Sequence, residues 1–168
     1  IKNFTLKEID NNNSQILVVG DSLADDVVSS LNTQNISAKR FNVNGPCFYA
    51  LATDGFCRGV YLENLIEKAL KSKLVILSTD YVNEKSEKGG IELYNLLLKK
   101  KVPVKVIGGL NFKYISSSSY RYAKYTFYGS HENFYYKNIQ PNVFSSNELL
   151  KEKIKNNYID KFGFVCNK

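Results

Sequence analysis

A serine stands directly after an apolar run in the stretch QILVVGDSLADDVVSSL, at position 22. At such a position the serine hydroxyl projects from a tight turn, and the backbone N–H groups that begin the next helix can stabilise an oxyanion. A nucleophilic serine also needs a base that takes its proton. The stretch therefore supports two interpretations. Ser22 is a nucleophile, or it is the N-cap of a helix with Asp25 three residues further on.

His131, in YGSHENFYY, is the only histidine and thus the only candidate for a histidine base. A general base has to reach the serine hydroxyl directly or through one water. His131 lies in a segment, 112–138, that is rich in tyrosine and phenylalanine. Long loops of this kind can fold over an active site, and aromatic rings stack on sugar faces. The alternatives are a surface or packing role for His131 and a loop packed by its own aromatic side chains.

Cys47 and Cys57 lie ten residues apart in NGPCFYALATDGFC. We expect a short disulfide loop, which implies an oxidising compartment; two separate buried thiols are the alternative. Cys166, the third cysteine, is then left without a partner in the chain. Three cysteines with one histidine do not form a convincing metal site, so we expect neither a metal nor another cofactor.

The composition is that of a globular protein: 168 residues, 43% hydrophobic, with a net charge of +7. No apolar run approaches the roughly 20 residues that span a bilayer. The lysines are scattered, so we do not expect nucleic-acid binding, whereas an anionic glycan or membrane surface would fit the charge. The chain begins at Ile1 without a methionine, as expected for a processed product or an excised domain.

Strand-like and helix-like segments alternate after a polar lead-in over 1–14. The expected strands cover 15–21, 37–43, 73–80, 104–110 and 158–167, and the expected helices cover 22–35, 60–72, 89–101 and 146–157, with a loop over 44–59. We expect Ser146 or Asn147 to cap the last helix. This alternation predicts a single domain over 15–168, a flavodoxin-like α/β/α sandwich in three layers around a parallel sheet of about five strands.

In such a sheet the working site lies beyond the carboxyl ends of the strands. The segments that follow those ends contain the candidate site residues, namely Asp21 and Ser22, Asn44 to Pro46, Thr79 to Tyr81 with Asn83, and Gly108 to Asn111. Because these segments meet at one edge of the sheet, function should be sought there.

The stretch VVGDSLADD resembles the first block of the SGNH, or GDSL, hydrolase superfamily, whose fold is the sandwich expected here. The resemblance implies that Ser22 is the nucleophile and that its N–H is one oxyanion donor. It also implies that Gly45, in NVNGPC, supplies a second N–H. The family's third donor is an asparagine in a Gly-x-Asn-Asp motif; this sequence has STDYVNEK there, so Asn83 is the stand-in.

The wider layout is similar to that of the soluble SGNH domains fused behind integral-membrane acyltransferases that O-acetylate bacterial surface glycans. The similar segments are GPCFYALATDGFC and NNYIDKFGFVC. The resemblance implies an O-acetyltransferase or esterase that acts on a cell-envelope glycan such as lipopolysaccharide. A membrane acyltransferase domain would deliver the acyl donor, and the protein would lie in the periplasm, tethered to the inner membrane. Asp21, Tyr81 and Asn111 would then contact the substrate.

The sequence departs from this family at its last block, Asp-x-x-His, which carries the triad's Asp and His. Tyr128 stands three residues before His131, so the block is missing from these 168 residues. The chain stops before the block, or another residue such as His131 is the base, or the domain is degenerate and binds a glycan or a partner without catalysis. A further alternative is a flavodoxin-like nucleotide or phosphate binder with Asp21, Asp25 and Asp26 as a metal-dependent cluster, although the sequence has no Gly-rich phosphate loop.

Overall fold

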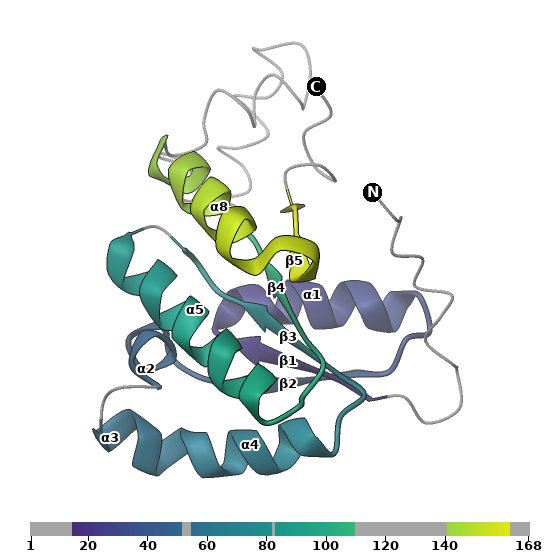
Figure 1. The fold of residues 1–168 in the computed structure, drawn as a ribbon. Coiled ribbons are helices and arrows are strands. Elements are labelled where there is room, and N and C mark those ends of the chain that lie inside the picture. Colours follow the sequence, from purple (N-terminus) through teal and green to yellow (C-terminus); the bar gives the residue numbers. More distant parts are fainter. Residues whose placement is uncertain (1–14, 52–54, 82, 110–140, 162–168) are drawn as a thin grey trace.

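The computed structural model describes residues 15–51, 55–81, 83–109 and 141–161. Its elements, in chain order, are β1 (Ile16–Gly20), α1 (Ser22–Thr33), β2 (Ala38–Asn42), α2 (Gly45–Ala50), α3 (Gly55–Cys57), a π-helical turn (Arg58–Leu62), α4 (Glu63–Leu70), β3 (Leu74–Ser78), α5 (Glu84–Lys99), β4 (Val104–Ile107), α8 (Pro141–Ile154), a 3-10 turn (Lys155–Asn157) and β5 (Tyr158–Ile159) (Figure 1). No helix in these ranges has both the length and the apolar character needed to cross a membrane.

The strands form one sheet of five parallel strands in the order β2-β1-β3-β4-β5. The interior strand β1 pairs on both sides, with Val18 opposite Arg40 of β2 and Ile76 of β3. Every residue of β1 is buried, as its unbroken apolar sequence predicts for a strand covered on both faces. The predicted parallel sheet is therefore confirmed.

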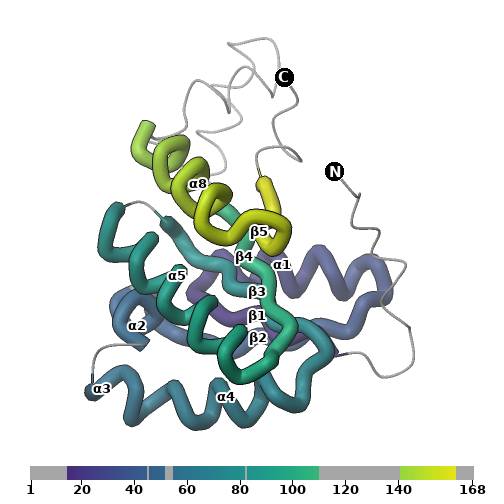
Figure 2. Tube along the Cα trace, in the orientation of Figure 1, coloured from purple at the N-terminus to yellow at the C-terminus, as the bar shows by residue number. Residues whose placement is uncertain are grey.

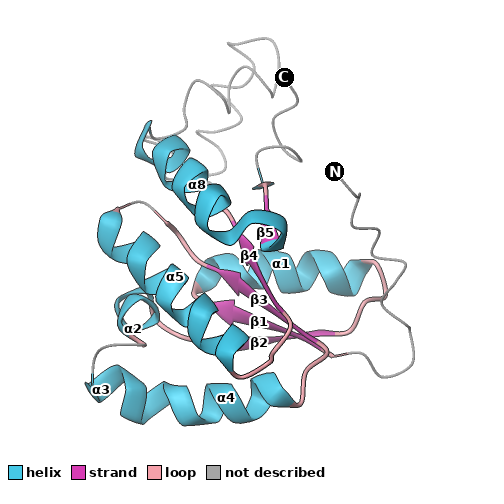
Figure 3. Ribbon diagram, in the orientation of Figure 1, coloured by secondary structure: helices cyan, strands magenta, loops and turns pink. Residues whose placement is uncertain are grey.

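Helices cover both faces of the sheet (Figures 2 and 3). Because successive side chains of a strand point to opposite faces, β1 contributes Ile16 and Val18 to one apolar layer and Leu17 and Val19 to the other. In the described residues α1 packs on the first face and α2, α4, α5 and α8 pack on the second. The three-layer α/β/α architecture predicted from the sequence is thus confirmed.

Helix α5 begins five residues earlier than the sequence pattern indicated. Asn83 is its N-cap: the Asn83 side chain accepts from the Ser86 N–H at 3.0 Å, and the Ser86 hydroxyl oxygen accepts from the Asn83 N–H at 3.1 Å. This reciprocal capping box satisfies two N–H groups that a helix start otherwise leaves without a partner. The polar first turn therefore belongs to the helix, although it lacks the apolar spacing that the prediction relied on.

The predicted cap of the last helix is wrong. Helix α8 begins at Pro141, so Ser146 and Asn147 lie inside it, and both are buried. Their polar groups have partners outside α8 instead. The Ser146 hydroxyl donates to the Glu87 carboxylate of α5, and the Asn147 Nδ2 donates to the Gly109 carbonyl oxygen at 3.0 Å. Residues that favour caps in isolation are here held by tertiary contacts.

The expected loop over 44–59 also contains helical structure, in α2 and α3. Helix α2 packs closely on α5 at Gly89, where a Cβ atom would lie 2.1 Å from the carbonyl oxygen of Tyr49. At the next position, a Cβ on Gly90 would lie 2.5 Å from the Tyr81 ring. The glycine pair in the middle of α5 thus leaves room for α2 and for a buried tyrosine.

The helices α1 and α5 end in the same way. In α5, Lys101 has a φ of 60°. Its N–H donates to the Leu98 carbonyl at 2.8 Å, and the Val102 N–H donates to the Leu97 carbonyl at 3.1 Å. This is a Schellman motif, which commonly has glycine at the left-handed position. In α1 the corresponding residue is Asn35, also with a φ of 60°.

Candidate functional site

The strand order places a switch point at the carboxyl end of β1, since the chain passes from β1 to β2 on one side and then returns to β3 on the other. Open α/β sheets bind ligands in the crevice outside such a point. Ser22, the first residue of α1, follows β1 there, and Thr79 follows β3. The candidate site is built from these two junctions together with α2.

Gly20 brings the two junctions together. A Cβ atom at this position would lie 1.7 Å from the Ser78 carbonyl oxygen, which is a backbone atom and cannot rotate away. Only glycine therefore lets the end of β1 approach the end of β3 this closely. The glycine of the Gly-Asp-Ser-Leu stretch has a clear structural reason in this chain.

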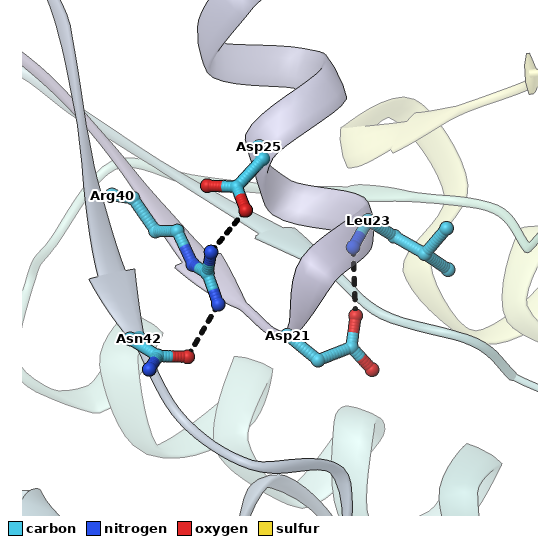
Figure 4. Close-up of polar contacts among 5 residues, drawn as sticks. All are labelled: Asp21, Leu23, Asp25, Arg40 and Asn42. Carbon is cyan, nitrogen blue, oxygen red and sulfur yellow. Dashed lines mark hydrogen bonds and ion pairs between the residues drawn. The ribbon is translucent and has the colours of Figure 1, made fainter.

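Asp21, and not Ser22, caps α1, which corrects the cap predicted from the sequence. Asp21 has an extended backbone, and its Oδ1 accepts from the Leu23 N–H at 3.0 Å (Figure 4). Its other carboxylate oxygen, Oδ2, accepts from the Thr79 hydroxyl at 2.8 Å. The carboxylate thus ties the start of α1 to the end of β3. Both of its oxygens already have partners, so this structural role stands beside the substrate contact predicted for Asp21.

Ser22 occupies the first helical position of α1, and its side chain is exposed. Because Asp21 caps the helix, the cap does not require the Ser22 hydroxyl. This hydroxyl forms no hydrogen bond with any residue in the described ranges. Its backbone N–H belongs to the first turn, where N–H groups have no partner within the helix. An exposed hydroxyl therefore lies beside its own backbone N–H, which the helix does not satisfy, while the Leu23 and Ala24 N–H groups donate to Asp21.

Tyr49 of α2 joins this network at the end of β3. Its hydroxyl donates to the Asp80 carbonyl oxygen at 2.9 Å. Burial raises the pKa of the Tyr49 phenol, and the nearby charge of Asp21 raises it further. A hydrogen bond with Thr79 opposes that shift in the pKa without reversing it. Tyr49 therefore stays protonated near neutral pH and acts as a hydrogen-bond donor there.

Gly45, the predicted second oxyanion donor, is the first residue of α2 and follows the end of β2. Asn44 caps this helix, since its side chain accepts from the Cys47 N–H at 2.9 Å. Cys47 is bonded to Cys57, with 5.2 Å between their Cα atoms. The predicted disulfide is therefore confirmed, and it ties α2 to α3.

The other predicted residues differ in their surroundings. Asn83 is exposed, and its Oδ1 is used in the cap of α5, while its Nδ2 forms no hydrogen bond with the residues that the structure describes. Tyr81 is fully buried, and its ring lies 6.3 Å from that of Phe48 between centroids. This burial favours a packing role for Tyr81 over the predicted contact with substrate. Asn111 and His131 lie outside the described residues, as does the aromatic segment 112–138.

The acidic residues of α1 do not gather into a metal site. Asp25 forms an ion pair with Arg40, which also donates to Asn42, and Figure 4 shows the Asp21 carboxylate pointing away from this pair. Asp26 is exposed. Within the part of the chain that the structure describes, no three His, Cys, Asp or Glu side chains come close enough to hold a metal ion.

The structure adds Tyr49 to the residues identified from the sequence and shows which partner the Thr79 hydroxyl has. Thr79 belonged to a segment expected at this edge, but nothing in the local pattern indicates that its hydroxyl reaches Asp21, 58 residues away. Tyr49 lay in the segment expected to be a loop. No protein-family model matches this chain, and no curated protein has a significant match to it.

Proposed function

We propose that Ser22 is the nucleophile of a serine-dependent acyl-transfer reaction, either ester hydrolysis or O-acyl transfer. One observation carries this proposal. Ser22 is exposed at the carboxyl end of β1, at the first position of α1, while the Asp21 side chain caps the helix and leaves the Ser22 hydroxyl free of that role. A serine that was only a cap would use its hydroxyl for the backbone.

In the first half of the reaction the Ser22 Oγ attacks the carbonyl carbon of an acyl donor, and its proton passes to a base. The tetrahedral intermediate collapses to an acyl-serine ester, and the leaving group departs with that proton. In the second half a hydroxyl of the acceptor, or water, attacks the ester and gives its proton to the base. The bond to Oγ then breaks, and Oγ recovers the proton.

The oxyanion of each tetrahedral intermediate needs fixed donors. We assign this role to the backbone N–H groups of Ser22 and Gly45, which begin α1 and α2 after neighbouring strands. The Asn83 Nδ2 is a further candidate, because capping uses only the oxygen of its amide. We propose His131 as the base.

We further propose that the acceptor is a hydroxyl of a cell-envelope glycan and that a membrane acyltransferase domain supplies the acyl group. This follows from the resemblance to SGNH domains of that kind. The disulfide between Cys47 and Cys57 supports an extracytoplasmic location, because disulfides persist in oxidising compartments.

The test is acylation by p-nitrophenyl acetate. We expect a burst of nitrophenol close to one equivalent per chain, with an acetyl group on the peptide that contains Ser22. Ser22→Ala should abolish the burst. Ser30→Ala, an exposed serine of the same helix, should retain it and is the matched control. An equal burst from Ser22→Ala and wild type, or an acetyl group on another residue, would refute the assignment.

A second candidate function is glycan or partner binding without catalysis. The absence of Asp-x-x-His from these 168 residues favours it. In that case wild type and Ser22→Ala are equally inert toward the ester, yet both bind envelope glycan with the same affinity. The two candidates thus differ in both the chemical and the binding measurement.

A further inference from the structure

The edge of the sheet opposite Ser22 carries most of the clustered lysines. Helices α4 and α5 both end at this amino edge, where β3 and β4 begin (Figure 1). The segment that leads from α4 into β3 meets the segment that leads from α5 into β4, since the Val75 N–H donates to the Pro103 carbonyl oxygen at 2.8 Å. We define the basic edge as the five exposed lysines of these segments, Lys71, Lys73, Lys99, Lys100 and Lys101.

Among the residues that the structure describes, one acidic side chain forms an ion pair with a lysine of the basic edge. Glu67 pairs with Lys71 at 2.5 Å, but both side chains are mostly exposed, and such a pair contributes little. Many acidic residues instead follow strands or begin helices at the carboxyl edge: Asp21, Asp25, Asp80, Glu84, Glu87 and Asp160. Six acidic residues therefore lie at the edge of the sheet opposite the basic edge, and the side-chain charges at the two edges offset the helix dipoles, whose positive ends lie at the carboxyl edge.

Two exposed leucines accompany the lysines. Leu70 is the last residue of α4 and is 59% exposed, and Leu98 lies in the last turn of α5 and is 41% exposed. A large apolar side chain next to several lysines is the pattern of a surface that contacts a bilayer. Its cations attract anionic headgroups, and its apolar groups enter the boundary with the acyl chains.

We propose that the basic edge, with Leu70 and Leu98, docks on the surface of an anionic lipid bilayer. A nucleic acid fits less well, because the sequences LKSK and LKKKVP contain neither an arginine nor an aromatic residue. Arginine forks and aromatic stacking are the groups that nucleic-acid sites use most. Docking this edge leaves the carboxyl ends of the parallel strands, and Ser22 with them, facing away from the bilayer. The proposal does not depend on Ser22 being a nucleophile.

The test is co-sedimentation of the whole chain with vesicles of about three parts phosphatidylglycerol to seven parts phosphatidylcholine. We expect binding to these vesicles, weaker binding as salt rises, and none to phosphatidylcholine alone. The triple variant Lys99→Gln/Lys100→Gln/Lys101→Gln should weaken binding by on the order of a hundredfold, at roughly fivefold for each lysine near the surface.

The matched control is Lys85→Gln/Lys88→Gln/Lys151→Gln, which removes the same charge from exposed lysines outside the basic edge. It should weaken vesicle binding by less than about tenfold, since charges beyond a Debye length are screened. Equal losses in the two triple variants would mean that net charge alone attracts the lipid, and would overturn the proposal. A failure of wild type to prefer the anionic vesicles would overturn it as well.

Substitution of the two leucines distinguishes binding to a bilayer from binding to another polyanion. Leu70→Ser/Leu98→Ser should weaken binding to vesicles several-fold, at an unchanged thermal midpoint, and leave any binding to a single-stranded RNA unchanged. A chain that binds the RNA more tightly than the vesicles, through the same lysines and without the leucines, would instead have a nucleic-acid surface at this edge. That result would refute the membrane proposal.

Discussion

The hydrogen bond between Thr79 and Asp21 should contribute measurably to stability, because it joins two strand ends that lie far apart in sequence. Thr79 is 2% exposed, and its hydroxyl donates to the Asp21 carboxylate at 2.8 Å. Thr79→Val removes this donor and keeps the shape of the side chain. A hydrogen bond to a charged group contributes about 1.5–3 kcal/mol.

Access of water to Asp21 reduces the loss of stability that we expect for Thr79→Val. Asp21 is only partly buried, so a water molecule can replace part of the lost donor. We therefore expect Thr79→Val to lower the free energy of unfolding by about 1–2 kcal/mol. In a domain of this size, such a change lowers the thermal midpoint by roughly 2–8 °C.

A double-mutant cycle isolates the contact. Asp21→Ala removes the cap of α1, at about 1 kcal/mol, and also removes the partner of Thr79. If the contact is as described, the double variant Asp21→Ala/Thr79→Val should be more stable than the sum of the single losses predicts, by about 1–2 kcal/mol. Thr79→Ser keeps the hydroxyl and should lose less than Thr79→Val.

The free energies come from urea unfolding followed by circular dichroism, and they are comparable as long as the slopes stay equal. A coupling energy below about 0.3 kcal/mol would show that Asp21 and Thr79 act independently. The Asp21 carboxylate would then cap α1 without linking it to β3, and our account of how Ser22 is positioned would be wrong.

Three further pairs of substitutions test other parts of the fold by the same urea unfolding. Gly20→Ala should destabilise the protein by more than about 3 kcal/mol or prevent folding, since its Cβ would lie 1.7 Å from a backbone carbonyl oxygen. Gly59→Ala, with open space around its Cβ, should stabilise the protein by about 0.5–1 kcal/mol. Equal effects of the two substitutions would contradict the close packing at Gly20. Lys101→Gly should stabilise by roughly 1 kcal/mol because it relieves a φ of 60°, and Lys101→Ala should not. Tyr49→Phe should lose about 1 kcal/mol with its hydrogen bond, while Tyr81→Phe should lose nothing at neutral pH, since the Tyr81 hydroxyl has no partner among the described residues. Burial raises the pKa of Tyr81 in the folded protein, so the unfolded chain loses this proton first and stability should fall above about pH 10, less steeply in Tyr81→Phe.

The sheet could be predicted because the sequence patterns that indicate its strands are local. Runs such as Ile16–Gly20 and Leu74–Ser78 are apolar and rich in branched residues, and helices of adequate length separate them, which requires parallel connections. The disulfide was also predictable, from two cysteines in one short segment. In each case the sequence signal and the structural cause lie within a few residues of each other.

The details of the site could not be predicted because their causes are distant. Asp21 and Ser22 are both favoured at caps, and the partner that holds Asp21 is Thr79, which the sequence places 58 residues away. The side chain of Tyr81 was expected at the edge of the sheet, but space left by Gly90 and contact with Phe48 bury it. The same applies to Asn147, whose partner is Gly109, in the segment that follows β4.

The paired glycines of α5 have a consequence for the order of folding. Gly89 and Gly90 together cost an isolated helix about 2 kcal/mol relative to alanine, so this segment should hardly be helical before it meets its partners. Those partners are the Tyr49 backbone and the Tyr81 ring. We therefore expect α5 to form late, after α2 has docked on the sheet, so that truncations in α5 mainly speed unfolding and leave the rate of folding almost unchanged.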